Sequence, residues 1–187
     1  MKVIARLIAG RSFLGNTRQI FFVDMGGYDH HAGINDSLPG LLQELDRGIG
    51  AFNAGMKELE QRDSDFNYNQ VTTFQASDFN RTWTPNGVDI NSAGTDHAWG
   101  SHCFVFGGAV QGGAFFGAYP ELAVGGKDDV PRSSRGRWIP TTAVDQYTAV
   151  LANWFGVPMQ SSEMQTILPN LNRFPNPLSA EANLQFL

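Results

Sequence analysis

Residues 19–31 read QIFFVDMGGYDHH and join an apolar run to a polar, glycine-containing end. An apolar run of about four to eight residues that stops at glycine is typical of a buried strand in a parallel sheet. We therefore expect residues 19–24 to form such a strand, with Gly26 and Gly27 beginning the loop at its carboxyl end. Functional loops of α/β sheets gather at that end of the strands.

Strand and helix signals alternate along the rest of the chain. Residues 70–75 and 103–107 are rich in β-branched and aromatic side chains and predict two further strands. Residues 2–9 have helical apolar spacing. Apolar residues that recur every three or four positions predict two more helices. The apolar face of the first comprises Leu38, Leu41, Leu42, Leu45, Ile49, Phe52, Met56 and Leu59. That of the second comprises Val144, Tyr147, Leu151, Trp154 and Phe155. The alternation predicts an α/β fold with a mostly parallel sheet.

The ends of these two helices also carry sequence signals. Asp36 and Ser37 are good N-cap residues and Pro39 suits a first turn, so we expect the longer helix to begin there. The stretch from Thr142 to Asp145 resembles a capping box and predicts the start of the second helix. Gly156 is expected to end it, because glycine adopts the left-handed conformation of a helix C-terminus without strain.

Length and charge set broad limits on domain organisation and partners. A chain of 187 residues suits a single domain over 1–187, with the Asn/Pro-rich residues 170–187 as an irregular tail on the surface. The net charge of −5 and the lack of any Lys/Arg run argue against nucleic acid and anionic membranes as partners. No apolar stretch reaches the length of a membrane span. Arg6 and Arg11 interrupt the apolar residues at the start, so a signal peptide is not expected.

Asp-His pairs are the clearest candidates for chemistry. Asp29 precedes His30 and His31, and Asp96 precedes His97, each time in a glycine-containing segment. Carboxylate oxygens and neutral imidazole nitrogens are common ligands of divalent metal ions. A single Asp-His pair is more often a surface feature or a hydrogen-bonded couple, but two such pairs favour a metal site. Asp78 follows the strand predicted over 70–75 and is a weaker fifth candidate.

Five blocks of the chain resemble, in order, blocks of the DUF1501 proteins. These bacterial proteins often carry a twin-arginine export signal and are grouped with the alkaline phosphatase and sulfatase superfamily. The blocks are FFVDMGGYDHHAG (21–33), TTFQASDFNRT (72–82), GTDHAWGSHCFVFGGAVQGG (94–113), RGRWIPTTAVDQYTAVLANWFGV (135–157) and ILPNLNRF (167–174). The resemblance implies a partial alkaline phosphatase-like fold with three α/β/α layers, and a periplasmic or exported location.

The same resemblance implies a set of site residues. The metal ligands would be Asp29, His31, Asp78, Asp96 and His97. The usual family form of the first block is Asp-Thr-His, which favours His31 over His30 as the ligand. Arg81, which closes a Ser-Asp-Phe-Asn-Arg string, would bind an oxygen of the substrate. The cofactor would be a divalent ion such as zinc, calcium or manganese.

The expected function is that of a metal-dependent hydrolase-like domain acting on phosphate or sulfate esters. The resemblance implies that the chain matches the C-terminal half of a longer domain. The nucleophile would then come from the N-terminal half or from a second chain that completes the site, and this fragment could be inactive alone. The partner expected within the site is a small anionic ester. The alternative is a non-catalytic exported module, for binding or structure, that keeps the fold.

Overall fold

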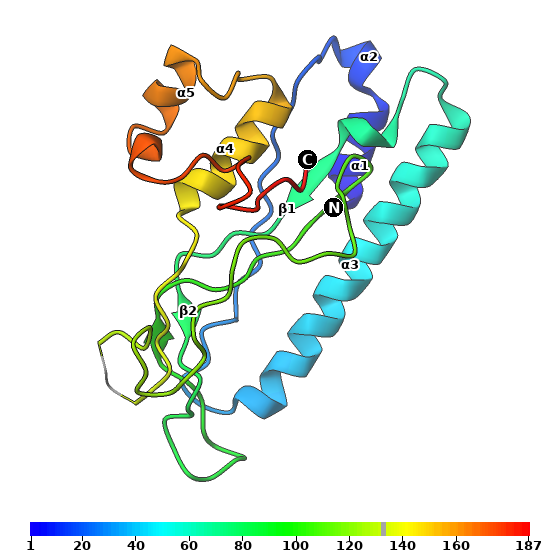
Figure 1. Cartoon of the computed structure of the whole chain (residues 1–187). Helices are drawn as coiled ribbons and strands as arrows, with labels where there is room; N and C mark the ends of the chain where they lie inside the picture. Colours follow the sequence, from blue (N-terminus) through cyan, green and yellow to red (C-terminus); the bar gives the residue numbers. More distant parts are fainter. Residues whose placement is uncertain (132–133) are drawn as a thin grey trace. The chain divides into compact units, whose positions relative to one another are not determined.

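The computed structural model describes residues 1–131 and 134–187, which divide into two compact units. Unit 1 comprises residues 1–71 and 85–96, and unit 2 comprises residues 72–84 and 97–187. Figure 1 traces the whole chain through both of them. The expected single domain over 1–187 stays a prediction.

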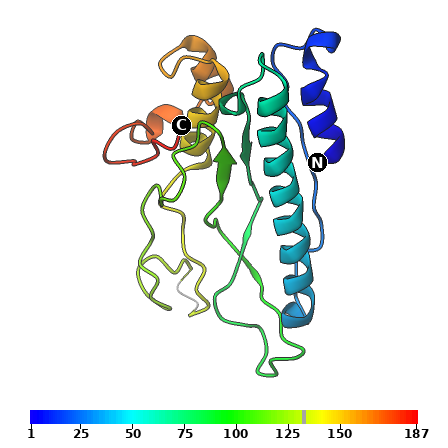
Figure 2. The same cartoon turned by 90° about the vertical axis from the view of Figure 1, so that its right-hand side faces the viewer.

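Unit 1 is built mainly from helices. In chain order they are α1 (Lys2–Ala9), α2 (Arg11–Leu14), α3 (Ile34–Arg62) and the 3-10 turn η1 (Tyr68–Gln70). Figures 1 and 2 show α1 lying alongside the long α3. The predicted helix over residues 2–9 is therefore confirmed, and so is the existence of the long amphipathic helix.

The core of unit 1 forms where α3 meets the segments that pack against it. Phe52 and Met56 of α3 are 5% and 1% exposed, and burial of such side chains contributes about 1.5–3 kcal/mol each. Ile8 of α1 and Phe66 are also buried. Arg11 lies over the Phe66 ring at 5.1 Å. The Arg11 side chain therefore covers part of this core while its guanidinium keeps polar contacts at the edge.

The start of α3 differs from the predicted one. The helix begins at Ile34 after Gly33, whose φ of 58° is left-handed, so Pro39 lies in the second turn rather than the first. The Ile34 N–H donates to the Ala93 carbonyl at 3.2 Å. A carbonyl distant in the sequence thus accepts from one of the unpaired N–H groups at the start of the helix. A side-chain cap at Asp36 or Ser37 was expected to do this.

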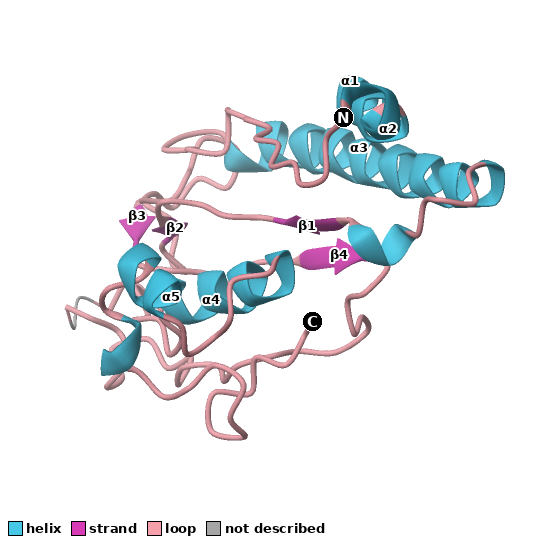
Figure 3. Cartoon of the chain, turned by 90° about the horizontal axis from the view of Figure 1, so that it is seen from above, coloured by secondary structure: helices cyan, strands magenta, loops and turns pink. Residues whose placement is uncertain are grey.

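Unit 2 contains two short antiparallel strand pairs and a helical end. The strands β1 (Thr72–Phe74) and β4 (Val105–Gly107) pair with each other, as do β2 (Asn80–Arg81) and β3 (His97–Ala98). The helical elements are α4 (Val144–Phe155), α5 (Ser162–Ile167) and the 3-10 turn η2 (Leu171–Arg173). Figure 3 shows β1 and β4 as neighbours, with loops making up most of the remaining chain.

Helix α4 organises the apolar core of unit 2. Val150 and Leu151 pack with Leu184 and Phe186, which are only 4% and 3% exposed. The irregular tail therefore contributes to the core at these two residues, and the expectation that it simply covers the surface is wrong there. Their place in the core follows from their apolar side chains, since an irregular backbone can bury them as well as a helix can.

The ends of α4 agree closely with the sequence signals. Its N-cap is Ala143, whose N–H donates to the Gln146 side chain, so the cap lies one residue beyond the predicted Thr142. Gly156 ends the helix with a left-handed φ of 110°, as expected.

A buried carboxylate holds the long loop that precedes α4. Asp129 is fully buried and accepts hydrogen bonds from the backbone N–H groups of Gly125, Gly136 and Arg137, at 2.8, 3.0 and 2.8 Å. These bonds, with the one from Gly125 first, lower the pKa of the Asp129 carboxyl from its ordinary value of 3.8. The Asp129 side chain thus adds to the single antiparallel bridge that Asp129 forms with Trp138 in this loop.

The predicted α/β/α fold with a mostly parallel sheet is wrong. Strand residues, with the isolated bridges included, make up only 8% of the chain and helices 35%. Both strand pairs among residues 1–131 and 134–187 are antiparallel. The apolar run over residues 19–24 forms no strand, and its Ile20 and Phe22 are 80% and 89% exposed. The pattern identified side chains suited to a buried strand, but a strand exists only where a second backbone pairs with it.

A helix that crosses a bilayer must be both long and apolar. No helix among residues 1–131 and 134–187 meets both requirements.

Candidate metal centre

Two polar loops of unit 1 are joined by backbone hydrogen bonds. Ala32 and Ala93 form an isolated antiparallel bridge. On one side of it the Gly33 N–H donates to the Ser92 carbonyl at 3.0 Å, and on the other the Thr95 N–H donates to the His30 carbonyl at 2.9 Å. Residues 28–33 and 92–96, which are far apart in the sequence, therefore form one paired-loop segment.

Gly94 permits this close approach. A Cβ atom at this position would lie within 2.5 Å of the Ala32 nitrogen and of the His30 carbonyl oxygen. Both are backbone atoms and cannot rotate away, so a residue with a side chain does not fit without moving a loop. The glycine that the sequence places directly before Thr95-Asp96 thus has a steric role in joining the loops.

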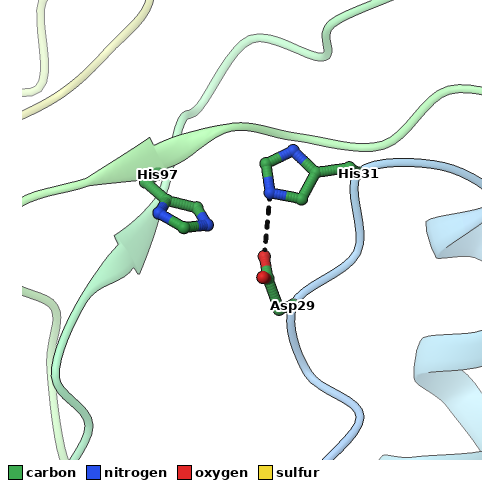
Figure 4. Close-up of side chains that lie close together, drawn as sticks. All are labelled: Asp29, His31 and His97. Carbon is green, nitrogen blue, oxygen red and sulfur yellow. Dashed lines mark ion pairs between the residues drawn. The ribbon is translucent and has the colours of Figure 1, made fainter.

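The His31 side chain lies between two carboxylates of the paired-loop segment. Its Nε2 is 3.0 Å from Asp29 Oδ1, and its Nδ1 is 3.5 Å from Asp96 Oδ1. Figure 4 shows the first of these contacts, with the Asp29 carboxylate directed at the imidazole ring. The side chains of Asp29, His31 and Asp96 are 50%, 52% and 32% exposed, so an ion from solvent reaches them without a change in fold.

The contact between Asp29 and His31 fits a pair of neighbouring metal ligands. Two ligand atoms held at about 2.1 Å from one ion, at angles of roughly 90–109°, are roughly 3.0–3.4 Å apart. The observed 3.0 Å lies at the lower end of this range. Asp96, facing the other ring nitrogen, has the place of a carboxylate that orients a metal-bound histidine.

His30 is placed differently from its neighbour. The residue is 8% exposed, and its carbonyl accepts the Thr95 N–H at 2.9 Å. His31, by contrast, is exposed and faces the carboxylates. Of the two histidines that the sequence offered as ligands, His31 has the geometry of one.

The remaining candidates belong to unit 2. Asp78 is exposed in the loop between β1 and β2. Arg81 pairs with His97 across β2 and β3, and its guanidinium lies 5.7 Å from the Phe79 ring centre. The His97 ring stacks on Phe79 at 4.1 Å. His97 and Asp96 are consecutive, so their Cα atoms are about 3.8 Å apart whatever the arrangement of the units.

Asn86 is a site residue that the sequence analysis missed. Its side-chain Nδ2 donates to Asp96 Oδ1 at 3.3 Å and to the His31 carbonyl at 2.9 Å. An asparagine in a segment rich in Gly, Asn and Asp is ordinarily interpreted as a turn residue. The only signal that pointed to it was its place in the loop that leads to Gly94.

One protein-family model matches a stretch of the chain that includes the whole paired-loop segment. The family model described as "Protein of unknown function (DUF1501)" matches residues 2–133, which is well over half of the chain. This chain belongs to the DUF1501 family. No match is found among curated proteins or among solved structures.

The family match confirms the resemblance in its first three blocks. Asp29, His31, Asp96 and His97 all lie in the matched part of this DUF1501 chain, whereas the blocks at 135–157 and 167–174 lie beyond it. The family description states no activity, so the function of this member has to be argued from its site.

Proposed function

We propose that this DUF1501 chain binds a divalent metal ion through Asp29 and His31. The observation that supports the proposal is the His31 ring, which faces Asp29 at 3.0 Å on one side and Asp96 at 3.5 Å on the other. A mixed set of imidazole and carboxylate ligands suits zinc or manganese better than calcium, which takes oxygen ligands only. His97, the chain neighbour of Asp96, is proposed as a further ligand, and Asp78 as a weaker one.

The reaction proposed for this centre is hydrolysis of a phosphate or sulfate ester. A bound divalent ion polarises the ester oxygens and offsets their charge. Asp29 and His31 hold the ion, Asp96 orients the imidazole, and Arg81 is proposed to bind an anionic oxygen of the substrate. The nucleophile is proposed to come from a second chain or from a further segment of a longer domain. A periplasmic or exported location is proposed with this function.

The second candidate function is ion binding without turnover, in an exported binding or structural module. The openness of the cluster favours it, because the Asp29 and His31 side chains are half exposed. Catalytic metal sites usually exclude water from the reacting centre, which strengthens electrostatic stabilisation of the transition state.

Metal uptake by the purified chain tests the first proposal. We expect about one ion per chain after equilibration with Zn²⁺ or Mn²⁺, measured by elemental analysis and isothermal titration calorimetry. Asp29→Asn and His31→Ala should each weaken binding at least about tenfold, since the first removes the charge of the carboxylate and the second removes the imidazole. Asp24→Asn and His102→Ala are matched controls, because both residues are exposed and lie outside the paired-loop segment. A wild-type chain that takes up none of Zn²⁺, Mn²⁺ or Ca²⁺ would refute the metal site.

Turnover separates the two candidate functions. The metal-loaded chain is incubated with p-nitrophenyl phosphate and p-nitrophenyl sulfate, with and without a chelator. Release of nitrophenol that the chelator abolishes, and that His31→Ala also abolishes, supports the hydrolase. Tight metal binding with no release of nitrophenol supports the binding module.

A further inference from the structure

The side chain of Asn86 uses its polar groups on both loops of the paired-loop segment. Nδ2 donates to the His31 carbonyl at 2.9 Å and to Asp96 Oδ1 at 3.3 Å. Oδ1 accepts the Gly94 N–H at 2.9 Å, and the Asn86 N–H donates to the Gly94 carbonyl at 3.0 Å. A primary amide offers two N–H donors and one carbonyl acceptor, and here both kinds of group are engaged.

We propose that Asn86 is the positioning residue of the metal centre. It fixes the rotation of the Asp96 carboxylate and ties that carboxylate to the backbone of His31. This inference rests on the proposed metal-binding function, because a positioning role has meaning only if His31 holds an ion.

The effect of Asn86 passes through two contacts. Asn86 Nδ2 and His31 Nδ1 both face the same oxygen, Asp96 Oδ1. A carboxylate whose rotation is fixed presents this oxygen to Nδ1 and so sets the plane of the imidazole. That plane directs Nε2 toward Asp29 Oδ1, 3.0 Å away. Outer partners of this kind fix the tautomer and the orientation of a histidine ligand.

The alternative role for Asn86 is that of a loop clamp with no influence on the ion. Asn35 supplies a matched comparison within the same unit. Its Nδ2 donates to the Ile90 carbonyl at 3.0 Å and it is exposed. In the part of the chain that the structure describes, its side chain bonds to neither Asp96 nor His31. If loop clamping were all that mattered, truncation of Asn35 and of Asn86 would have similar consequences.

The test compares Asn86→Ala, Asn86→Asp and Asn35→Ala with the wild-type chain. Asn86→Asp keeps the acceptor for the Gly94 N–H. Its second carboxylate oxygen takes the place of the donor to Asp96 Oδ1 and to the His31 carbonyl, so both of those hydrogen bonds are lost. Zn²⁺ affinity is measured by titration calorimetry, and thermal unfolding is recorded for each variant. We expect both Asn86 variants to bind Zn²⁺ roughly 10–100-fold more weakly, and Asn35→Ala to bind it as the wild type does.

A second readout does not need the ion. The ring nitrogens of His31 are observed in the metal-free chain by two-bond ¹H–¹⁵N correlation spectra. Loss of the Asn86 donor should change the His31 ring ¹⁵N shifts, whereas Asn35→Ala should leave them unchanged. This spectrum reports on the imidazole and its partner, and a residue that merely stabilised the fold would not alter it.

The outcomes separate failure of this inference from failure of the metal site. A wild-type chain that binds no Zn²⁺ refutes the proposed function and, with it, the positioning role. A wild-type chain that binds Zn²⁺ while both Asn86 variants bind it equally well, with unchanged His31 shifts, refutes the positioning role alone. Equal weakening by Asn35→Ala also refutes it. If Asn86→Ala does not fold, Asn86→Asp carries the test.

Discussion

In two nearby stretches of unit 1, the backbone pairing is the opposite of what the side chains predict. Among the described residues, the apolar stretch is unpaired, and the polar stretch is paired. Residues 19–24 are apolar and were expected to be a buried strand, yet Ile20 and Phe22 are 80% and 89% exposed. Within the described part of the chain, their backbone groups take part in no hydrogen bonds. Residues 28–33, which follow after three intervening residues, are mostly polar, yet a bridge and several backbone bonds join them to residues 92–96.

This difference shows that apolar character and local order are separate properties. A buried strand needs both a surface to cover its side chains and a second backbone to satisfy its N–H and carbonyl groups. Residues 19–24 have the side chains without either of these. The paired-loop segment has few apolar side chains, but its two loops are joined by backbone hydrogen bonds, and the Asn86 amide reaches the His31 carbonyl 55 positions away. The predictions below test whether order follows backbone pairing.

The largest effect is expected from Gly94→Ala. The added Cβ would approach the backbone of His30 and Ala32 within 2.5 Å, which forces the two loops apart. We expect a loss of about 1–3 kcal/mol in the free energy of unfolding, measured by urea denaturation, and loss of metal binding.

Gly50→Ala is the matched control for that substitution. Gly50 lies within α3, is exposed, and has nothing within 4 Å of an added Cβ. Alanine there should raise the free energy of unfolding by about 0.5–1 kcal/mol, because glycine is the poorer helix former. A Gly94→Ala chain that is as stable as the wild type and still binds metal would show that the loops are not held by their close approach.

The second effect concerns the loop of unit 2 that is held by Asp129. Asp129→Asn keeps the size of the side chain, but it replaces one acceptor oxygen with a donor that faces backbone N–H groups. We expect a lower melting temperature in differential scanning calorimetry at neutral pH, and faster amide exchange at Gly125, Gly136 and Arg137. Unchanged exchange at these three amides would contradict the role given to the carboxylate.

The pH dependence of this effect has a defined sign. The pKa of the Asp129 carboxyl is lower in the folded chain than its ordinary value of 3.8, so the unfolded chain binds the proton more readily. The stabilisation is therefore present above about pH 3.8 and is lost as the pH falls through the folded value. The gap in melting temperature between the wild type and Asp129→Asn should shrink as the pH is lowered through this window.

The smallest effect is expected from Phe22→Ser. Phe22 is 89% exposed, so its removal should change the free energy of unfolding by no more than about 0.5 kcal/mol in urea denaturation. The same change at Phe52, which is 5% exposed in α3, should cost at least about 3 kcal/mol. Destabilisation by Phe22→Ser comparable to that by Phe52→Ser would mean that residues 19–24 are buried in the folded chain after all.

The sequence predicted single elements better than it predicted their assembly. The helices over residues 2–9 and 144–155 and the strand cores over 72–74 and 105–107 were found where expected, because helical spacing and β-branched runs are local signals. The parallel sheet was not found. Strand direction and the number of partners depend on contacts between distant residues, and β1 pairs antiparallel with β4.

The candidate site divides in the same way. Asp29, Asp96 and the pair His30-His31 were recognised from residue type and from their glycine-containing surroundings, and the family resemblance favoured His31. The structure brings Asp29, His31 and Asp96 together. Asn86 went unnoticed because nothing about an isolated asparagine distinguishes a turn residue from a clamp. Its contacts with residues 8, 10 and 55 positions away exist only in the tertiary structure.

The sequence by itself determined the chemistry available to this DUF1501 chain, namely carboxylates and imidazoles on glycine-containing loops, and it determined the helices, which depend on bonds between near neighbours. Only the tertiary structure decided that His31 rather than His30 faces the carboxylates, that Gly94 lets the loops meet, and that residues 19–24 remain unpaired. The physical reason is that each of these outcomes depends on which backbone lies opposite which. Residue type limits that choice, but contacts between distant parts of the chain determine it.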